Sequence, residues 1–145
     1  MDNISKRYVE MVEKAKEFRS DWFPRFGDYA YNYEKGIGQL FLDDEKTLWI
    51  KWGSEDKPEG IMFNYDENSN NEVFRPKTLF LPRLRALEKM VLSTSMGSMT
   101  PAKFYQFREE WKGMLGEEKE LWFAYFMKVK YGKHWDFDRR AWINE

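Results

Sequence analysis

The chain has 145 residues, no cysteine, and 24 basic against 25 acidic side chains, for a formal net charge of −1. Disulfides, thiolate metal sites and cysteine nucleophiles are therefore excluded. The near-neutral balance argues against a protein that depends mainly on phosphate contacts, since such proteins usually carry a clear positive excess. The length fits one domain, and we expect a single α+β domain over residues 1–145.

Aromatic residues are the distinctive part of the composition, with 12 Phe, 8 Tyr and 7 Trp. Each buried aromatic side chain removes ~150–250 Å² from water, so a short chain of this kind can form a stable core. We expect some of the tryptophans to be exposed or covered by a partner. No segment approaches the ~20 apolar residues that span a bilayer, and the N-terminus lacks the apolar part of a signal peptide. We therefore expect a cytoplasmic protein without membrane contact.

The first half of the chain predicts one helix followed by a sheet. Apolar residues at helical spacing predict an amphipathic helix from Ile4 to Arg19. Alternating tyrosines and short turns then predict an antiparallel meander of three to four strands. The candidate strands are Asp28–Tyr33, Gln39–Leu42, Thr47–Trp52, Ile61–Tyr65 and Thr78–Leu81.

The second half predicts three more helices, over Pro82–Leu92, Thr100–Leu115 and Glu117–Tyr131. Gly132 is expected to end the last helix, before an aromatic tail. In that helix one apolar stripe is expected to form the core, namely Leu121, Trp122, Tyr125, Phe126 and Val129. The order of elements indicates an α+β fold with about four helices against the sheet.

Three segments together resemble a known group of proteins. They are Gly27-Asp28-Tyr29 with Gly36-Ile37-Gly38, Phe80-Leu81-Pro82-Arg83 with Leu87 and Met90, and Leu121–Tyr131 followed by His134-Trp135 and Ala141-Trp142. This pattern resembles small uncharacterised proteins encoded in tailed phages and prophages of Gram-positive bacteria, some of them described as α/β sandwiches. The resemblance implies a phage accessory protein and brings no catalytic residues with it.

The sequence contains few residues with a catalytic or metal-binding pattern. His134 is the only histidine, and Asp136 or Asp138 could orient it as a general base. The same two aspartates could hold a divalent cation. A histidine after a helix C-terminus and an acidic pair in a turn are also common structural features, and we favour that interpretation. Gly36-Ile37-Gly38 is followed by β residues, which indicates a hairpin turn and not a nucleotide-binding loop.

A basic cluster is the strongest candidate for a binding site in the sequence. It consists of Arg75, Lys77, Arg83, Arg85 and Lys89. These side chains could neutralise phosphates while Phe74 or Phe80 stacks on bases. The alternative is a solvated face that forms salt bridges with acidic loops.

We therefore predict a non-enzymatic phage or prophage accessory protein that acts through protein–protein contacts, with another protein or as a homo-oligomer. No cofactor and no metal are expected. The alternative is a nucleic-acid-binding module that uses the basic cluster of residues 75–89. A hydrolase built on His134 and Asp136 is the least supported of the three hypotheses.

Overall fold

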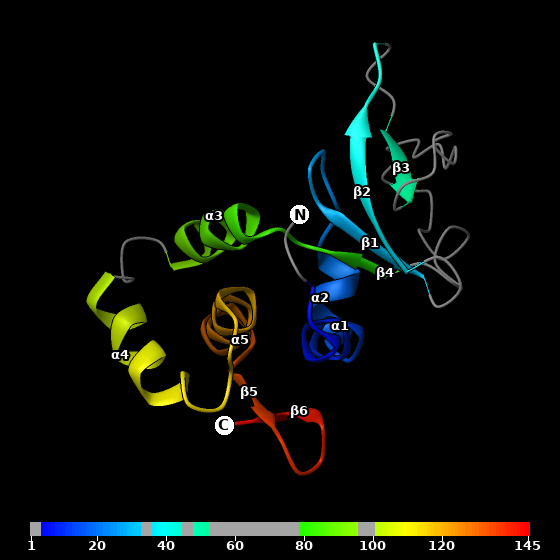
Figure 1. The fold of residues 1–145 in the computed structure, drawn as a ribbon. Coiled ribbons are helices and arrows are strands. Elements are labelled where there is room, and N and C mark those ends of the chain that lie inside the picture. Colours follow the sequence, from blue (N-terminus) through cyan, green and yellow to red (C-terminus); the bar gives the residue numbers. More distant parts are fainter. Residues whose placement is uncertain (1–3, 33–35, 45–47, 53–78, 96–100) are drawn as a thin grey trace. The chain divides into compact units, whose positions relative to one another are not determined.

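The computed structural model describes residues 4–32, 36–44, 48–52, 79–95 and 101–145. The chain divides into two compact units, a helical unit of residues 1–22 and 83–145 and a sheet unit of residues 23–82. Within the described residues there are five helices, a four-stranded antiparallel sheet and a two-stranded sheet (Figure 1). The predicted α+β class is confirmed. The prediction of a single domain over residues 1–145 stays a prediction.

The sheet unit contains four strands in the order β3-β2-β1-β4. Their bounds are Tyr29–Asn32 (β1), Gly36–Leu42 (β2), Leu48–Trp52 (β3) and Leu79–Leu81 (β4). Strands β1, β2 and β3 form the predicted meander, whereas β4 pairs with β1, so that Tyr29 lies opposite Leu81. The predicted strand Ile61–Tyr65 lies outside the described residues.

The glycines and the aspartate of the phage-like pattern have structural roles in this sheet. Gly27 has a φ of 92°, a conformation that favours glycine. The buried Asp28 carboxylate accepts a hydrogen bond from the Arg25 backbone N–H at 2.7 Å. A Cβ on Gly38 would lie 2.8 Å from the ring of Trp52, so a larger residue would collide there. Gly36, Ile37 and Gly38 lie within β2 and pair with β1, so the expectation of a hairpin turn at these three residues is wrong.

The helical unit contains the remaining elements. Their bounds are Lys6–Glu13 (α1), Lys16–Asp21 (α2), Leu84–Ser95 (α3), Pro101–Trp111 (α4), Glu118–Tyr131 (α5), Lys133–Asp136 (β5) and Ala141–Asn144 (β6). Gly132 ends α5 in the left-handed conformation, as predicted, with a φ of 64°.

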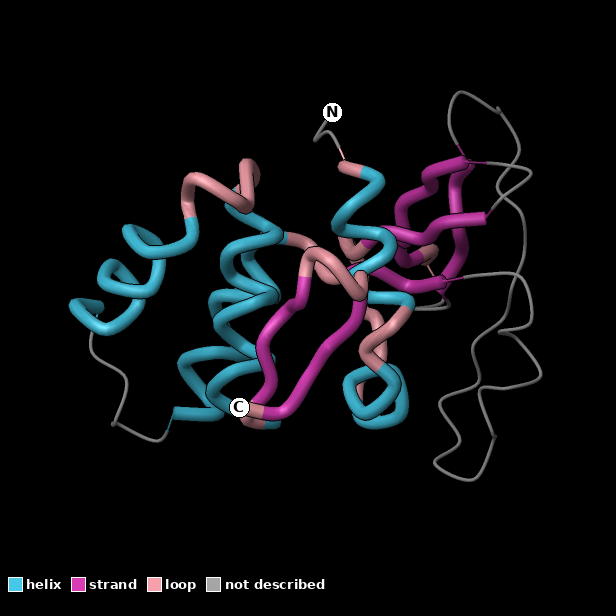
Figure 2. The backbone as a smooth tube through the Cα atoms, turned by 90° about the horizontal axis from the view of Figure 1, so that it is seen from below, coloured by secondary structure: helices cyan, strands magenta, loops and turns pink. Residues whose placement is uncertain are grey.

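Two elements of this unit differ from the sequence prediction. The single helix expected from Ile4 to Arg19 is two helices, because the chain leaves helical geometry at Ala15, whose ψ is 77°. The apolar spacing continues through the break, so periodicity alone does not reveal it. The expected tail is a hairpin of β5 and β6, in which Trp135 lies opposite Trp142; it ends at the label C in Figure 2.

The core of the helical unit is an aromatic cluster centred on Phe123 of α5, which is fully buried. Its ring makes edge-to-face contacts with Phe18 of α2 at 5.0 Å, Trp142 of β6 at 5.7 Å and Tyr8 of α1 at 6.0 Å between centroids. Such contacts add to the stabilisation from area burial. Phe123 therefore joins four elements from both ends of the chain.

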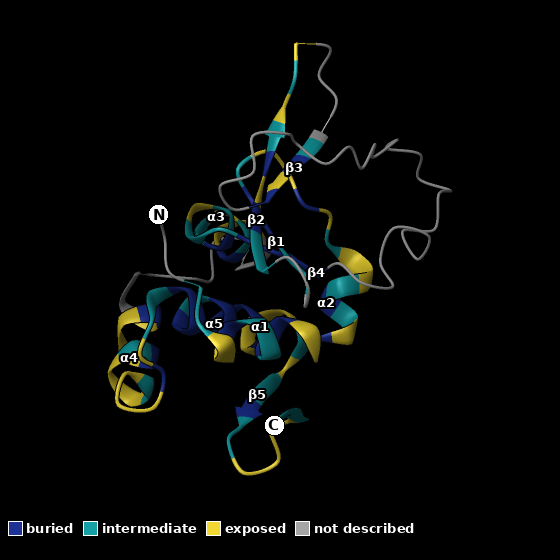
Figure 3. Cartoon of the chain, turned by 45° about the vertical axis from the view of Figure 1, so that its right-hand side comes forward, coloured by how far each residue is buried: buried dark blue, intermediate teal, exposed yellow. Residues whose placement is uncertain are grey.

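The predicted core stripe of α5 is partly wrong. Leu121, Tyr125 and Phe126 are buried, but Trp122 is half-buried and Val129 is exposed. The stripe omitted Phe123 and Met127, which are both fully buried. The reason is that α5 contacts α1, α3, α4 and β5, so it is buried on more than one side (Figure 3). A single-stripe pattern assumes one buried side.

We expect Phe123→Ala to lower the free energy of unfolding by ~3–5 kcal/mol, the usual range for truncating a buried Phe. Val129→Ala is the control in the same helix, and it should change stability by less than ~0.5 kcal/mol because Val129 is exposed. Urea denaturation followed by circular dichroism measures both. Equal losses of stability in the two variants would contradict the burial of Phe123 and the exposure of Val129.

Candidate functional site

The residues considered for hydrolase chemistry lie in the β5–β6 hairpin. His134 lies half-buried in β5, opposite Ile143. The Asp136 Oδ1 atom accepts backbone hydrogen bonds from Asp138 and Arg139, each at 2.9 Å. This carboxylate closes the β5–β6 turn, as the structural interpretation predicted. Among the described residues, no cluster of three or more histidines and carboxylates could hold a metal ion.

The basic cluster is described in part. Arg75 and Lys77 lie outside the described residues, and Arg83 is half-buried just before α3. Arg85 and Lys89 are both exposed and lie one turn apart on α3, so they share one face of the helix. We call this pair the α3 basic face.

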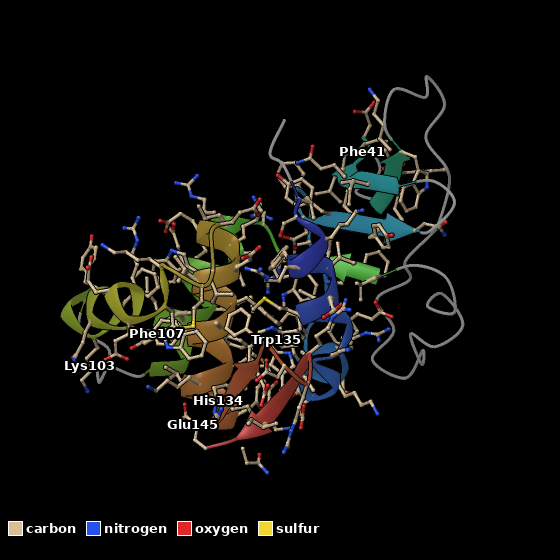
Figure 4. The ribbon with its side chains drawn as sticks, turned by 60° about the horizontal axis from the view of Figure 1, so that its bottom comes forward. Phe41, Lys103, Phe107, His134, Trp135 and Glu145 are labelled. Atoms are coloured by element: carbon tan, nitrogen blue, oxygen red, sulfur yellow. The ribbon has the colours of Figure 1, made fainter. Side chains whose placement is uncertain are left out.

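A groove between α4 and α5 was not predicted from the sequence. It has a volume of about 410 Å³ and is lined by Lys103, Gln106, Phe107, Glu110, Tyr125, Lys128, Val129 and Glu145. We call it the α4–α5 groove; Figure 4 labels Lys103, Phe107 and Glu145 around it. The sequence signal that could have indicated it is the row of apolar residues Phe104, Phe107 and Trp111 on α4.

The floor of the α4–α5 groove is aromatic. Phe107 and Tyr125 are almost fully buried, and their ring centroids lie 5.2 Å apart. Burial raises the pKa of the Tyr125 hydroxyl above its ordinary value. The Lys128 ammonium lies 5.7 Å from the Phe107 ring centroid, and Val129 is exposed at the edge. The groove therefore combines an apolar floor with polar groups at its rim.

A row of stacked rings leads from this groove to a second pocket. Phe107 stacks on Trp111 at 5.6 Å, and Trp111 stacks on Phe137 at 6.1 Å between centroids. The Arg7 guanidinium lies 5.4 Å from the centroid of Phe137. The row connects α4 to the β5–β6 turn and to α1.

The second pocket lies between α1 and the β5–β6 hairpin and has a volume of about 310 Å³. We call it the α1–hairpin pocket. Its lining residues are Lys6, Arg7, Glu10, Trp135, Phe137 and Arg140. Three of these are cations and one is a carboxylate. Sequence reasoning missed this site because its basic residues come from opposite ends of the chain.

Polar contacts hold both sides of the α1–hairpin pocket in place. The Arg140 Nε atom donates to Glu10 Oε1 at 2.8 Å, and a second guanidinium nitrogen donates to Glu10 Oε2. Lys14 Nζ donates to the Arg140 carbonyl at 2.6 Å. On the other side, Arg7 Nη1 donates to the Met114 carbonyl at 2.6 Å. Both guanidinium groups are thus held in defined positions.

A buried carboxylate connects α1 to α5. Glu120 accepts a hydrogen bond from the Ser5 hydroxyl at 2.5 Å, and Ser5 Oγ in turn accepts from the Tyr8 backbone N–H at 3.0 Å. Arg7 lies 3.6 Å from the second Glu120 oxygen. Ser5 is therefore both the N-cap of α1 and the residue that orients the Glu120 carboxylate.

The hairpin is also bound to α1 and α2 through ion pairs. The hydrogen bond from Arg140 is the main cause that lowers the pKa of Glu10, and the hydrogen bond from Lys133 likewise lowers the pKa of Glu17. In addition, the Trp142 indole N–H donates to the Met11 carbonyl at 2.8 Å.

The seven tryptophans are less accessible than the sequence suggested. Trp52 and Trp135 are buried, and the other five are half-buried. The exposed large apolar residues of the described helical unit are Leu92, Tyr105, Met114 and Val129. The apolar side chains most accessible to a partner in this unit are therefore these four residues and not a tryptophan.

Comparison of the chain with protein-family models, curated proteins and solved structures finds no match. No helix in the described residues has both the length and the apolar character required to cross a bilayer.

The Glu10–Arg140 pair makes stability depend on pH. A carboxyl group whose pKa is lowered by folding contributes stability above its unfolded pKa of about 4.5, and loses it as the pH falls through the folded pKa. Between roughly pH 6 and pH 3 we expect Glu10→Gln to lose less stability than the wild type, as measured by urea midpoints. Leu92→Gln, at an exposed residue of α3 that does not titrate, is the control and should keep the wild-type pH dependence. An unchanged pH dependence in Glu10→Gln would contradict this linkage.

Proposed function

We propose that this protein is a non-enzymatic accessory protein, of phage or prophage origin, which acts by binding another protein through the α4–α5 groove. The observation that carries the proposal is a groove with a buried aromatic floor and a rim that bears groups of both charges. The resemblance to phage and prophage proteins supports the proposed origin.

The rim chemistry favours a polypeptide as the bound molecule. Gln106 offers an amide, Glu110 a carboxylate and Lys128 an ammonium group. A peptide backbone presents both N–H donors and carbonyl acceptors, so it can use all three. A nucleic acid presents phosphates, and the carboxylates of Glu110 and Glu145 would offset the attraction from Lys103 and Lys128.

The apolar floor supplies the anchoring position. Interfaces are dominated by a few residues that bury apolar or aromatic surface within a polar rim. An apolar side chain of the partner would lie over Phe107 and Tyr125, next to the exposed Val129. We therefore propose that the partner contributes a segment with one apolar anchor flanked by polar residues.

Val129→Glu tests the groove, because it places a charge at the edge of the apolar floor without removing a buried side chain. Affinity purification from producing cells, followed by titration of the identified purified partner, should show at least roughly tenfold weaker binding. Leu92→Glu makes the same kind of change at an exposed residue of α3 and should bind as the wild type does.

The same variants distinguish a homo-oligomer. If the partner is a second copy, light scattering should show a wild-type oligomer that Val129→Glu dissociates and Leu92→Glu does not. A partner or an oligomer that both variants retain equally would place the interface outside the groove.

A second candidate function is nucleic-acid binding by the α3 basic face. The observation that favours it is that Arg85 and Lys89 are exposed on one side of the same helix. Two cations at this spacing can contact neighbouring phosphates.

We expect the α3 basic face, if it binds DNA or RNA, to do so with an affinity that falls steeply with salt, since neutralised phosphates release counterions. Arg85→Glu/Lys89→Glu should then abolish the gel shift. The control Lys16→Glu/Lys51→Glu changes the net charge equally at two exposed lysines elsewhere and should retain it. The absence of any shift with the wild type at low salt would exclude this second function.

A further inference from the structure

The α1–hairpin pocket has a composition that the protein-binding proposal does not explain. Three cationic side chains, Lys6, Arg7 and Arg140, line it together with one carboxylate. Lys6 and Arg7 come from α1, whereas Arg140 comes from the hairpin, so the cations approach from two sides. Glu10 pairs with Arg140 and the Glu120 carboxylate lies 3.6 Å from Arg7, so the group keeps a positive excess through Lys6 that would attract an anion.

The two arginines are positioned before any ligand arrives. The Arg7 guanidinium is held by the Met114 carbonyl, by the ring of Phe137 and by the Glu120 carboxylate at 3.6 Å. Arg140 is held by two hydrogen bonds to Glu10. A guanidinium carries five N–H donors, so each group retains donors beyond those that fix its position. This arrangement lowers the entropy lost when an anion binds.

Lys6 supplies the adaptable part of the site. It is exposed and makes no ion pair with any residue in the part of the chain that the structure describes. A lysine ammonium on a flexible stem can move toward an anion, while the planar guanidinium groups provide the fixed geometry. One lysine and two arginines together match an anion with several acceptor oxygens.

We propose that the α1–hairpin pocket is a binding site for a phosphate monoester. The phosphate group has three terminal oxygens and a charge near −2 at neutral pH, which matches three cations better than a single carboxylate would. The volume of about 310 Å³ leaves room for the first atoms of the esterified group. The Phe137 ring already contacts the Arg7 guanidinium at 5.4 Å and the Trp111 ring at 6.1 Å between centroids, so we assign recognition to the phosphate group.

The α1 helix supports the same ligand. Its first turn contains Lys6 and Arg7 and no acidic residue. The partial positive charge of a helix N-terminus favours anions and disfavours cations. The three side-chain cations form the site, and two of them come from this helix.

Titration calorimetry of the full chain with inorganic phosphate, at an ionic strength held constant with chloride, tests the site. We expect saturable binding of one phosphate, and binding at least roughly tenfold weaker in Lys6→Glu because a cation is replaced by an anion. Lys16→Glu is the matched control, since it makes the same charge change at an exposed lysine that does not line the pocket, and it should bind as the wild type does. No saturable heat with the wild type, or equal affinity in Lys6→Glu, would overturn the proposal.

A further pair of probes identifies the source of the phosphate. A phosphoserine peptide that binds at least about tenfold tighter than glycerol phosphate would indicate a phosphorylated protein, because the flanking peptide adds contacts. Equal affinities would indicate a small phosphate ester. Val129→Glu should leave phosphate binding unchanged, so failure of the groove proposal and failure of this one can be told apart.

Discussion

The packing of rings around Phe123 is the contact on which the rest of the helical unit depends. Edge-to-face contacts favour particular directions, and those from Tyr8, Phe18 and Trp142 fix the rotation of α5 about its axis. That rotation turns Tyr125 toward α4, where it becomes part of the groove floor. The same cluster holds β6, and therefore the hairpin that forms one wall of the second pocket. The α4–α5 groove and the α1–hairpin pocket therefore both depend on the packing around Phe123.

The polar contacts of the hairpin have a different role from that of the aromatic core. The side chains of the Arg140–Glu10 and Lys133–Glu17 pairs are partly exposed, and exposed pairs contribute little net stability. Their effect is to select one position of the hairpin along α1 and α2. The hydrogen bond from the Trp142 indole to Met11 selects the same position. As a result, Arg140 faces Lys6 and Arg7 across a cavity of defined size.

The phage-like pattern consists mainly of residues that shape the backbone or fill the core. Gly27, Asp28 and Gly38 set the geometry of the sheet, and Trp135 and Trp142 face each other across the hairpin. A pattern of this kind reports packing, because buried residues are close-packed and a change of size or shape is felt by their neighbours. Tyr125, Lys128, Val129 and Trp135 of the pattern also line the two pockets, but the other lining residues lie outside the pattern, so function had to be argued from geometry.

Local signals in the sequence were sufficient for the α+β class, the β1–β3 meander, the glycine that ends α5 and the turn at Asp136, because periodicity and turn chemistry act within a few residues. The break at Ala15, the hairpin after Gly132 and the burial of Phe123 instead of Val129 depend on which elements surround each segment. The α1–hairpin pocket shows this most clearly. Lys6 and Arg140 are near opposite ends of the chain, and no local pattern relates them; they meet because the hairpin packs against α1 through the aromatic core and the Glu10 ion pair.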